Sequence, residues 1–163
     1  MSDGAAGHTI EVVRGRLGED RAAQILRFWS DVGALGEEEA RRRLPEVVCV
    51  LLDGEGGIAG VNSVYPGSVE LIGGRLFWLY RSLLAPGAEE SWRAMHRAAF
   101  QALESEFDPD RGGPIGLCAA IGDRATMKRY PEAEWSDPRT LYAGYLPDGG
   151  QVRVAYFAGA KIS

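Results

Sequence analysis

The stretch Arg75–Phe107 contains residues whose arrangement could hold an anion. Its apolar first part, Arg75–Leu84, is typical of a strand, and the amphipathic part after a Pro-Gly corner is typical of a helix. A strand that leads into a helix N-terminus directs unpaired backbone N–H groups toward one point. The corner carries Glu89 and Glu90 rather than glycines and a cation, and acids in a first helical turn commonly complement the helix dipole. Two interpretations stay open: an anion site, or a helix start with ordinary acidic residues.

Aromatic and basic side chains line the same strand. Strand alternation places Arg81 on one face and Trp78 and Tyr80 on the other. Because Arg81 inside a strand is costly unless paired, we expect its partner to be either a substrate carboxylate or an internal acid such as Glu70. We expect a cavity with aromatic walls. Its substrate-binding residues are Trp29, Tyr65, Trp78, Tyr80, Arg81 and Trp135.

Composition indicates one globular domain, residues 9–163, after a polar tail 1–8 that we expect to be disordered. The net charge of −5 argues against partners such as nucleic acids and anionic membranes. We find no signal-peptide pattern and no apolar run of about 18 residues. These features predict a cytoplasmic protein that does not enter a membrane.

Two cysteines and two histidines are too few and too scattered for a metal site. Cys49 and Cys118 each lie inside an apolar run, which predicts two buried thiols rather than a disulfide. His96 lies four residues after Trp92 on a half-buried helix face, so we expect it to be packed rather than to act as a base. No metal is expected.

Eleven segments follow one another in the order β-α-α-β-β-β-α-β-α-β-β. Strands are expected at Thr9–Arg14, Val47–Leu52, Ile58–Tyr65, Arg75–Leu84, Ile115–Ile121, Leu141–Leu146 and Val152–Phe157. Helices are expected at Asp20–Val32, Glu37–Leu44, Glu89–Phe107, and from near Asp123 to before Pro131. Pro66-Gly67 is expected to end the third strand, and the second helix is expected to carry the i,i+4 pairs Glu37–Arg41, Glu38–Arg42 and Glu39–Arg43.

This order resembles that of the GNAT superfamily of N-acetyltransferases, from Thr9 to Phe157. A second resemblance lies in Asp123, Tyr130 and Trp135, which stand where the family has an Asn, a Tyr seven residues later and an aromatic residue five beyond that. The resemblance implies an α/β (α+β) fold: a GNAT-like mixed, mostly antiparallel sheet of about seven strands flanked by helices.

The resemblance also implies a reaction, the transfer of an acyl group from acetyl-CoA or another acyl-CoA to an amine of a small molecule or peptide. Tyr130 is then the catalytic general acid toward the departing thiolate, and solvent or an acid such as Glu70 relays the amine proton. An alternative is that the Tyr130 ring packs in the core with its hydroxyl at the surface. The cofactor-binding positions implied are Ser82, Leu83, Leu84, Ala85, Ser91, Trp92 and Asp123.

The chain departs from the family at the corner. The family reads Arg/Gln-x-x-Gly-x-Gly/Ala before the third helix, and this chain reads PGAEESW over residues 86–92. Three hypotheses therefore stay open: an N-acyltransferase that uses acyl-CoA, a transferase with a different donor, and a ligand- or partner-binding module of the same fold. The sequence leaves a homodimer open.

Overall fold

The computed structural model describes residues 7–162, so residues 1–6 of the predicted tail lie outside the described part. The strands are β1 (Thr9–Val12), β2 (Val47–Leu52), β3 (Ile58–Val69), β4 (Arg75–Leu84), β5 (Gly116–Ile121), β6 (Glu134–Trp135), β7 (Thr140–Tyr145) and β8 (Gln151–Tyr156). The α-helices are α1 (Glu19–Asp31), α2 (Glu37–Arg43), α3 (Trp92–Glu104) and α4 (Arg124–Arg129). Three short 3-10 turns are η1 (Leu44–Glu46), η2 (Glu70–Ile72) and η3 (Glu89–Ser91).

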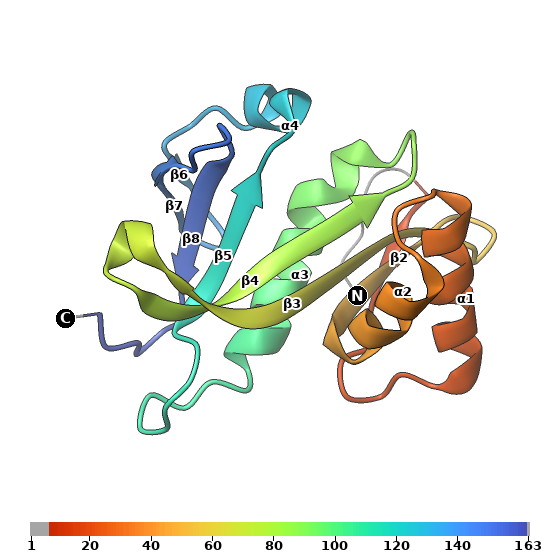
Figure 1. Cartoon of the computed structure of the whole chain (residues 1–163), viewed down its shortest axis with the longest axis horizontal. Coiled ribbons are helices and arrows are strands. Elements are labelled where there is room, and N and C mark those ends of the chain that lie inside the picture. Colours follow the sequence, from red (N-terminus) through yellow and green to blue (C-terminus); the bar gives the residue numbers. More distant parts are fainter. Residues whose placement is uncertain (1–6, 163) are drawn as a thin grey trace. The chain divides into compact units, whose positions relative to one another are not determined.

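The strands form one sheet in the order β1-β2-β3-β4-β5-β8-β7-β6 (Figure 1). β4 and β5 pair in parallel, whereas β1–β2, β2–β3, β5–β8, β7–β8 and β6–β7 are antiparallel. The predicted mixed, mostly antiparallel sheet is confirmed, and the short strand β6 is an addition to the expected seven or so. The chain divides into two compact units. Unit 1 is the chain to Val64 with Ser82–Ala102, and unit 2 is Tyr65–Arg81 with the chain from Leu103 onward.

The third strand does not end at Pro66-Gly67, so that prediction is wrong: β3 continues to Val69. Gly67 permits a close contact there, because a Cβ at this position would lie 2.5 Å from Cδ1 of Leu79 on the neighbouring strand. Proline is tolerated within a strand where its missing N–H is not needed by the ladder. The turn that follows closes through Gly73 and Gly74, both at positive φ.

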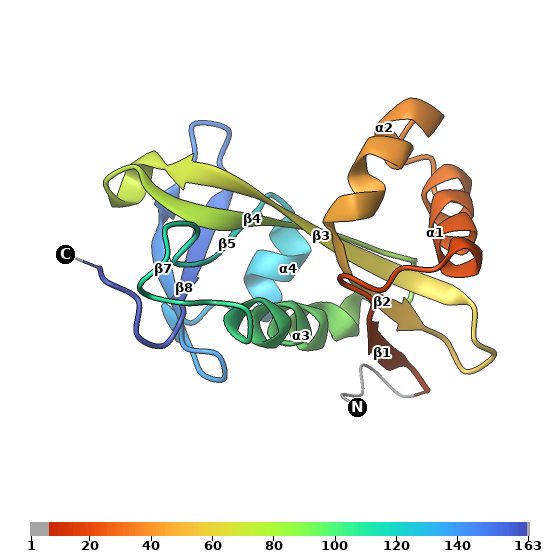
Figure 2. The ribbon, with the colours of Figure 1, turned by 90° about the horizontal axis from the view of Figure 1, so that it is seen from below.

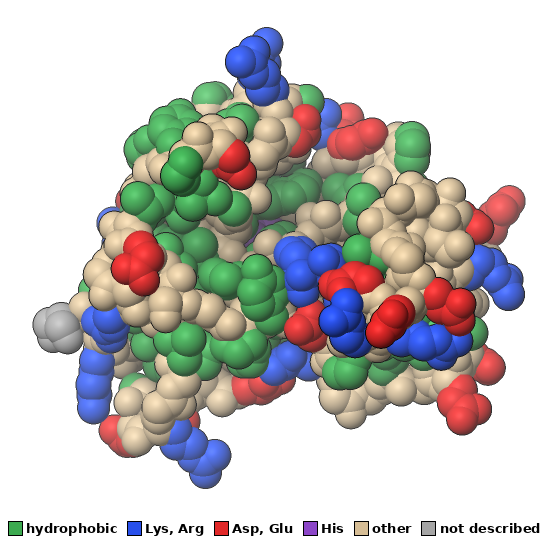
Figure 3. All heavy atoms as spheres, viewed as in Figure 1, with side chains coloured by type: hydrophobic (Ala, Val, Ile, Leu, Met, Phe, Trp, Pro, Cys, Tyr) green, Lys and Arg blue, Asp and Glu red, His purple; other side chains and the backbone are tan. Residues whose placement is uncertain are grey.

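Charged side chains of both signs alternate over α2 (Figure 3). Arg41 pairs with Glu37 at 3.2 Å and Arg43 with Glu39 at 2.9 Å, as predicted. Arg42 pairs with Glu39 rather than with Glu38, because Glu39 lies within reach three residues earlier. The Arg41–Glu37 and Arg42–Glu39 pairs are exposed and lie on the solvated face of this short helix, whereas Arg43–Glu39 is partly buried.

The core of unit 1 lies between the first strands and the first two helices. Figure 2 shows α1 and α2 on one side of β1 and β2. The buried side chains that pack there come from α1, α2, β2 and β3 and from the residue that follows β1: Val13, Ile25, Phe28, Trp29, Ala40, Val47, Val50 and Val61. β2 is buried on both faces along most of its length, as predicted.

A fully buried amide ties α3 to the strands of unit 1. Asn62 has 0% of its surface exposed. Its Oδ1 accepts a hydrogen bond from the Cys49 N–H at 2.8 Å, beside an irregularity in the β2–β3 register. Its Nδ2 donates to the main-chain oxygen of Met95 in α3 at 3.0 Å. One side chain therefore fixes β2, β3 and α3 together.

His96 is packed within α3, as predicted. It is 1% exposed, and its ring stacks on Trp92 with ring centres 5.3 Å apart and planes 11° apart. Burial lowers the pKa of His96 to about 3, and the charges of Arg93 and Arg97 act in the same direction. The imidazole is therefore neutral throughout the physiological pH range.

Unit 2 has its own core, between β5, β8 and β7 and the hairpin that contains η2. Its buried members are Val69, Phe77, Cys118, Val152 and Val154. The hairpin reaches β7, because a Cβ on Gly144 would meet Leu71 Cδ1 at 3.4 Å. Hydrophobic side chains also gather on the surface of this unit (Figure 3).

Both cysteines are free and buried, which confirms that prediction. Burial raises the pKa of the Cys49 thiol to about 12 and that of Cys118 to about 11, so neither is a nucleophile at neutral pH. Among the residues described, no cluster of His, Cys, Asp and Glu is arranged to hold a metal ion. Within the same residues, no helix has the length and apolar character needed to span a bilayer.

We predict that Asn62→Ala lowers the free energy of unfolding by about 1–3 kcal/mol, because it leaves the buried Cys49 N–H without its acceptor. Urea denaturation followed by circular dichroism measures this. Gln24→Ala, which removes an exposed amide, serves as the control and should change stability by no more than about 0.5 kcal/mol. Equal effects of the two substitutions would contradict the role given to Asn62.

We also predict a pH-dependent stability that originates at His96. Its pKa in the folded chain lies below the ordinary value of 6.5, so only the unfolded chain takes up this proton as the pH falls below about 6.5. The free energy of unfolding then decreases by up to about 1.4 kcal/mol per pH unit down to about pH 3. His96→Phe should flatten this slope between pH 6 and 4, whereas His8→Gln should keep it. Identical slopes in both variants would be evidence against a buried, neutral His96.

Candidate active site

The last residues of β4 form a backbone edge in unit 1. The parallel ladder with β5 joins Trp78–Leu117, Leu79–Cys118 and Tyr80–Ala119, and among the described residues it extends no further, while β4 runs on to Leu84. The Ala85 N–H donates to the Ala59 oxygen of β3 at 2.8 Å. Successive residues of a strand direct their N–H and C=O groups to opposite edges, so Ser82 and Leu84 present theirs away from β3.

Of the four residues predicted to offer main-chain groups to a ligand, Ser82–Ala85, only some direct these groups away from β3. The Ala85 N–H is engaged with β3, and its carbonyl accepts a hydrogen bond from Ala88 N–H at 3.0 Å. Leu83 alternates with Ser82 and Leu84 and so faces β3. Ser82 and Leu84 are therefore the two residues whose main-chain groups suit an extended ligand.

The corner between β4 and α3 holds a carboxylate of its own. Gly87 has a φ of 91°, and its N–H donates to Glu89 Oε2 at 2.9 Å. Ser91 is buried, and its N–H bonds the Ala88 oxygen at 3.0 Å within η3. The position where a bound anion would meet the Gly87 N–H is thus taken by Glu89. Trp92, the other predicted residue of this corner, stacks on His96.

Asp123 and Tyr130 lie at the two ends of α4 in unit 2. Asp123 is the N-cap, as predicted: its carboxylate accepts from the N–H groups of Ala125 and Thr126 at 3.2 and 3.0 Å and from the Thr126 hydroxyl at 2.6 Å. The bonds from Thr126 and Ala125 lower the pKa of Asp123. Tyr130 is the C-cap and is half-buried, and its ring meets the Trp135 ring edge to face at 5.7 Å.

A buried cation, Arg153, contacts both Tyr130 and Trp135. Arg153 of β8 places its Cζ 4.5 Å from the centre of the Trp135 ring and donates to the main-chain oxygen of Tyr130 at 3.4 Å. Sequence reasoning did not single out Arg153. The sequence does contain a signal for it. Arg153 stands between Val152 and Val154 in a predicted strand, and strand alternation places its side chain on the opposite face from the two valines.

The predicted substrate residues are distributed over both compact units, Trp29 in unit 1 and the other five in unit 2. Trp29 belongs to the core of unit 1 and is 4% exposed, so packing accounts for it. In unit 2, the Cζ of Arg81 lies 4.2 Å from the centre of the Tyr65 ring. The expected partners of Arg81 were a substrate carboxylate or an internal acid, and an aromatic ring is a third kind of partner. Tyr80 is buried and Trp135 lies against Tyr130.

Trp78 lines a separate small pocket of unit 2, of about 180 Å³, together with Phe107, Arg111 and Phe157. This volume is below the range of about 300–1,000 Å³ typical of sites for small organic ligands.

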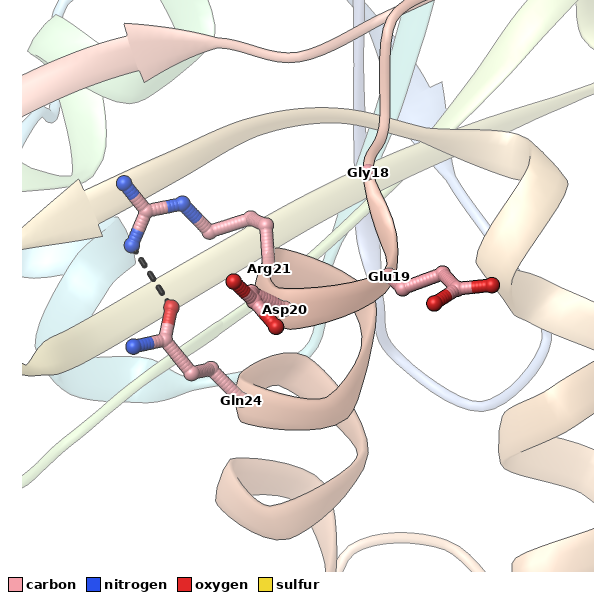
Figure 4. A pocket seen from close by; sticks show the side chains of 5 residues that line it. All are labelled: Gly18, Glu19, Asp20, Arg21 and Gln24. Atoms are coloured by element: carbon pink, nitrogen blue, oxygen red, sulfur yellow. Dashed lines mark hydrogen bonds between the residues drawn. The ribbon is translucent and has the colours of Figure 1, made fainter.

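A larger hollow, of about 590 Å³, lies at the start of α1 in unit 1 (Figure 4). Gly18, Glu19, Asp20, Arg21 and Gln24 line it. Arg21 donates to Gln24 at 2.7 Å and to both carboxylate oxygens of Glu11 at 3.1 Å, while Glu19 points away from Arg21 and Gln24. It contains none of the predicted site residues, and its charged groups are explained by these pairs and by the helix dipole.

Comparisons with known proteins bear on the fold. No protein-family model matches the sequence, and no curated protein matches it. A GCN5-related N-acetyltransferase from Kribbella flavida matches the structure with a TM-score of 0.60 at 14% identity, over 92% of this chain and 98% of that one. FeeM, an N-acyl amino acid synthase from uncultured soil microbes, gives 0.53 at 13% identity over 92% and 91%. The toxin AtaT, solved with the C-terminus of the antitoxin AtaR, gives 0.54 at 10% identity over 93% and 94%.

At these identities the likeness concerns the fold. It extends over nearly the whole chain. The chain has the fold of the GNAT-family N-acetyltransferases.

Proposed function

We propose that this chain is an N-acyltransferase, with acetyl as the expected acyl group, a CoA thioester as the donor and an amine of a small molecule or peptide as the acceptor. The structural neighbours named as acetyltransferases and as an N-acyl amino acid synthase support this class of reaction. Two free, buried cysteines fit a reducing compartment, which supports the cytoplasm as the place of the reaction.

One observation carries the proposal: β4 continues past its ladder with β5 and presents the main-chain groups of Ser82 and Leu84 away from β3. The pantetheine arm of an acyl thioester contains amides that form hydrogen bonds with such an edge as an added strand would. Holding the thioester in an extended form fixes its carbonyl carbon for attack, and positioning supplies much of the rate of such a transfer.

Tyr130 would supply the proton that the reaction needs. A neutral amine nitrogen attacks the thioester carbonyl carbon, the C–S bond breaks, and the thiolate takes a proton from the Tyr130 hydroxyl. The acylated nitrogen loses its own proton to solvent or to the carboxylate of an acidic residue such as Glu70, and the tyrosinate is reprotonated from water. The half-buried ring held by Trp135 supports a fixed hydroxyl for this role.

A second candidate differs in the donor, and the bond between Gly87 N–H and Glu89 favours it. A carboxylate repels a diphosphate and occupies the N–H that would hold one. The donor would then be a pantetheine thioester that binds along β4 and makes no contact through a nucleotide diphosphate. A ligand- or partner-binding module that performs no transfer is the third hypothesis, and the kinetic experiment below separates it from both.

Tyr130→Phe is expected to lower kcat for acetyl transfer from acetyl-CoA to a panel of amines by roughly 10²–10⁴-fold, because the general acid is lost. Product formation followed by thiol release measures this. Tyr145→Phe removes a hydroxyl from an exposed ring of the same unit and should leave kcat unchanged. Unchanged turnover in Tyr130→Phe would show that its ring is merely packed, and no turnover of any amine by the wild type would favour the binding module.

Glu89→Gln is expected to lower KM for acetyl-CoA by roughly twofold to fivefold, because an exposed charge at a helix start contributes about 0.3–1 kcal/mol. KM for acetyl-pantetheine, which lacks the diphosphate, should not change. The matched control is Glu90→Gln, since Glu90 is the exposed neighbouring acid. If both substitutions act alike on both donors, the Glu89–Gly87 bond has no part in donor choice.

A further inference from the structure

Arg153 is among the largest fully buried side chains of the described residues, with 1% of its surface exposed. It lies in β8 between Val152 and Val154, whose side chains pack in the core on the other face of the strand. Its Nε donates to Gln151 Oε1 at 2.9 Å, so its own strand fixes one edge of the guanidinium plane.

The rest of the guanidinium contacts three other segments of unit 2. One terminal nitrogen donates to the main-chain oxygen of Tyr130 at the end of α4. Its Cζ lies 4.5 Å from the ring centre of Trp135 in β6 and 5.8 Å from that of Tyr142 in β7. A single side chain therefore connects β8 with α4, β6 and β7.

Burying a guanidinium carries a desolvation penalty, and the contacts that offset this penalty depend on direction. Aromatic ring faces attract the cation, and the planar fork of donors bonds fixed oxygens. α4 has six residues and is too short to be stable by itself. The position of its C-cap residue, Tyr130, therefore depends on contacts such as those of Arg153.

Arg153 reaches Tyr130 by two routes: directly at the main-chain oxygen, and through the Trp135 ring, which stands at 67° to the Tyr130 ring with centres 5.7 Å apart. We propose that Arg153 is a positioning residue that fixes the orientation of the Tyr130 phenol. This rests on the proposed function, in which that phenol protonates the leaving thiolate.

Steady-state kinetics give the first test. In Arg153→Met, kcat should fall by up to about 100-fold, the scale of a misplaced catalytic group, while KM for the donor changes little. Arg153→Lys should restore part of kcat, because an ammonium keeps the charge but cannot bond Gln151 and Tyr130 in one plane. Arg139→Met, which removes an exposed cation paired with Glu134 beside Trp135, should retain the wild-type kcat. Equal losses in Arg153→Met and Arg139→Met would overturn the proposal.

A spectroscopic test does not depend on turnover. The protein is labelled with 3-fluorotyrosine, and the ¹⁹F resonance of Tyr130 is assigned from its loss in Tyr130→Phe. In Arg153→Met this resonance should shift or broaden, and in Arg153→Lys it should move in the same direction by less. The matched control is Arg81→Met, which removes the cation over Tyr65 and should move the Tyr65 resonance and not that of Tyr130.

A Tyr130 resonance that is unchanged in the Arg153 variants would overturn the proposal, whether or not the protein transfers acyl groups. If Arg153→Met does not fold, Arg153→Lys decides alone. A wild type without acyl transfer but with a Tyr130 resonance that moves in the Arg153 variants would refute the proposed function and leave the positioning contact established.

Discussion

The parallel pairing of β4 with β5 is the constraint on which the rest of this structure depends. Parallel neighbours cannot be joined by a tight turn, so the chain must leave the end of β4, cross a face of the sheet and return at the start of β5. α3 makes this crossing, and the buried amide of Asn62 ties it to β2 and β3. The corner after β4 and the position of α4 after β5 both follow from this one connection.

Polar side chains then fix the positions of particular elements within this framework. Asn62 bonds the backbone of β2 and α3, whereas Arg153 links the backbone and the aromatic rings around Tyr130. At the corner, the Gly87 N–H donates to the Glu89 carboxylate, so this chain places an anion of its own at that N–H group. In the proposed function, holding a thioester along β4 and repelling its diphosphate are therefore separate properties of neighbouring residues.

Periodicity and turn residues were enough to predict the order of elements, because strands such as Val47–Leu52 and the N-cap Asp123 carry local signals. They did not predict that β3 passes through Pro66-Gly67, since Gly67 accommodates Leu79 from a neighbouring strand. The burial of Trp29 in the core of unit 1 was not predictable either, because a core tryptophan and one that contacts Tyr130, such as Trp135, have the same local pattern. Arg153 shows the same limit, because its partners come from three other segments.

Thermal unfolding with acyl thioesters tests most directly whether this chain binds its donor along β4. We predict that acetyl-CoA and acetyl-pantetheine both raise the Tm, by roughly 3–5 °C at ten times Kd, because a ligand that binds only the folded chain stabilises it. Free adenosine diphosphate should give no shift, since Glu89 occupies the corner. The absence of any shift with either thioester at millimolar concentration would contradict a thioester site on β4.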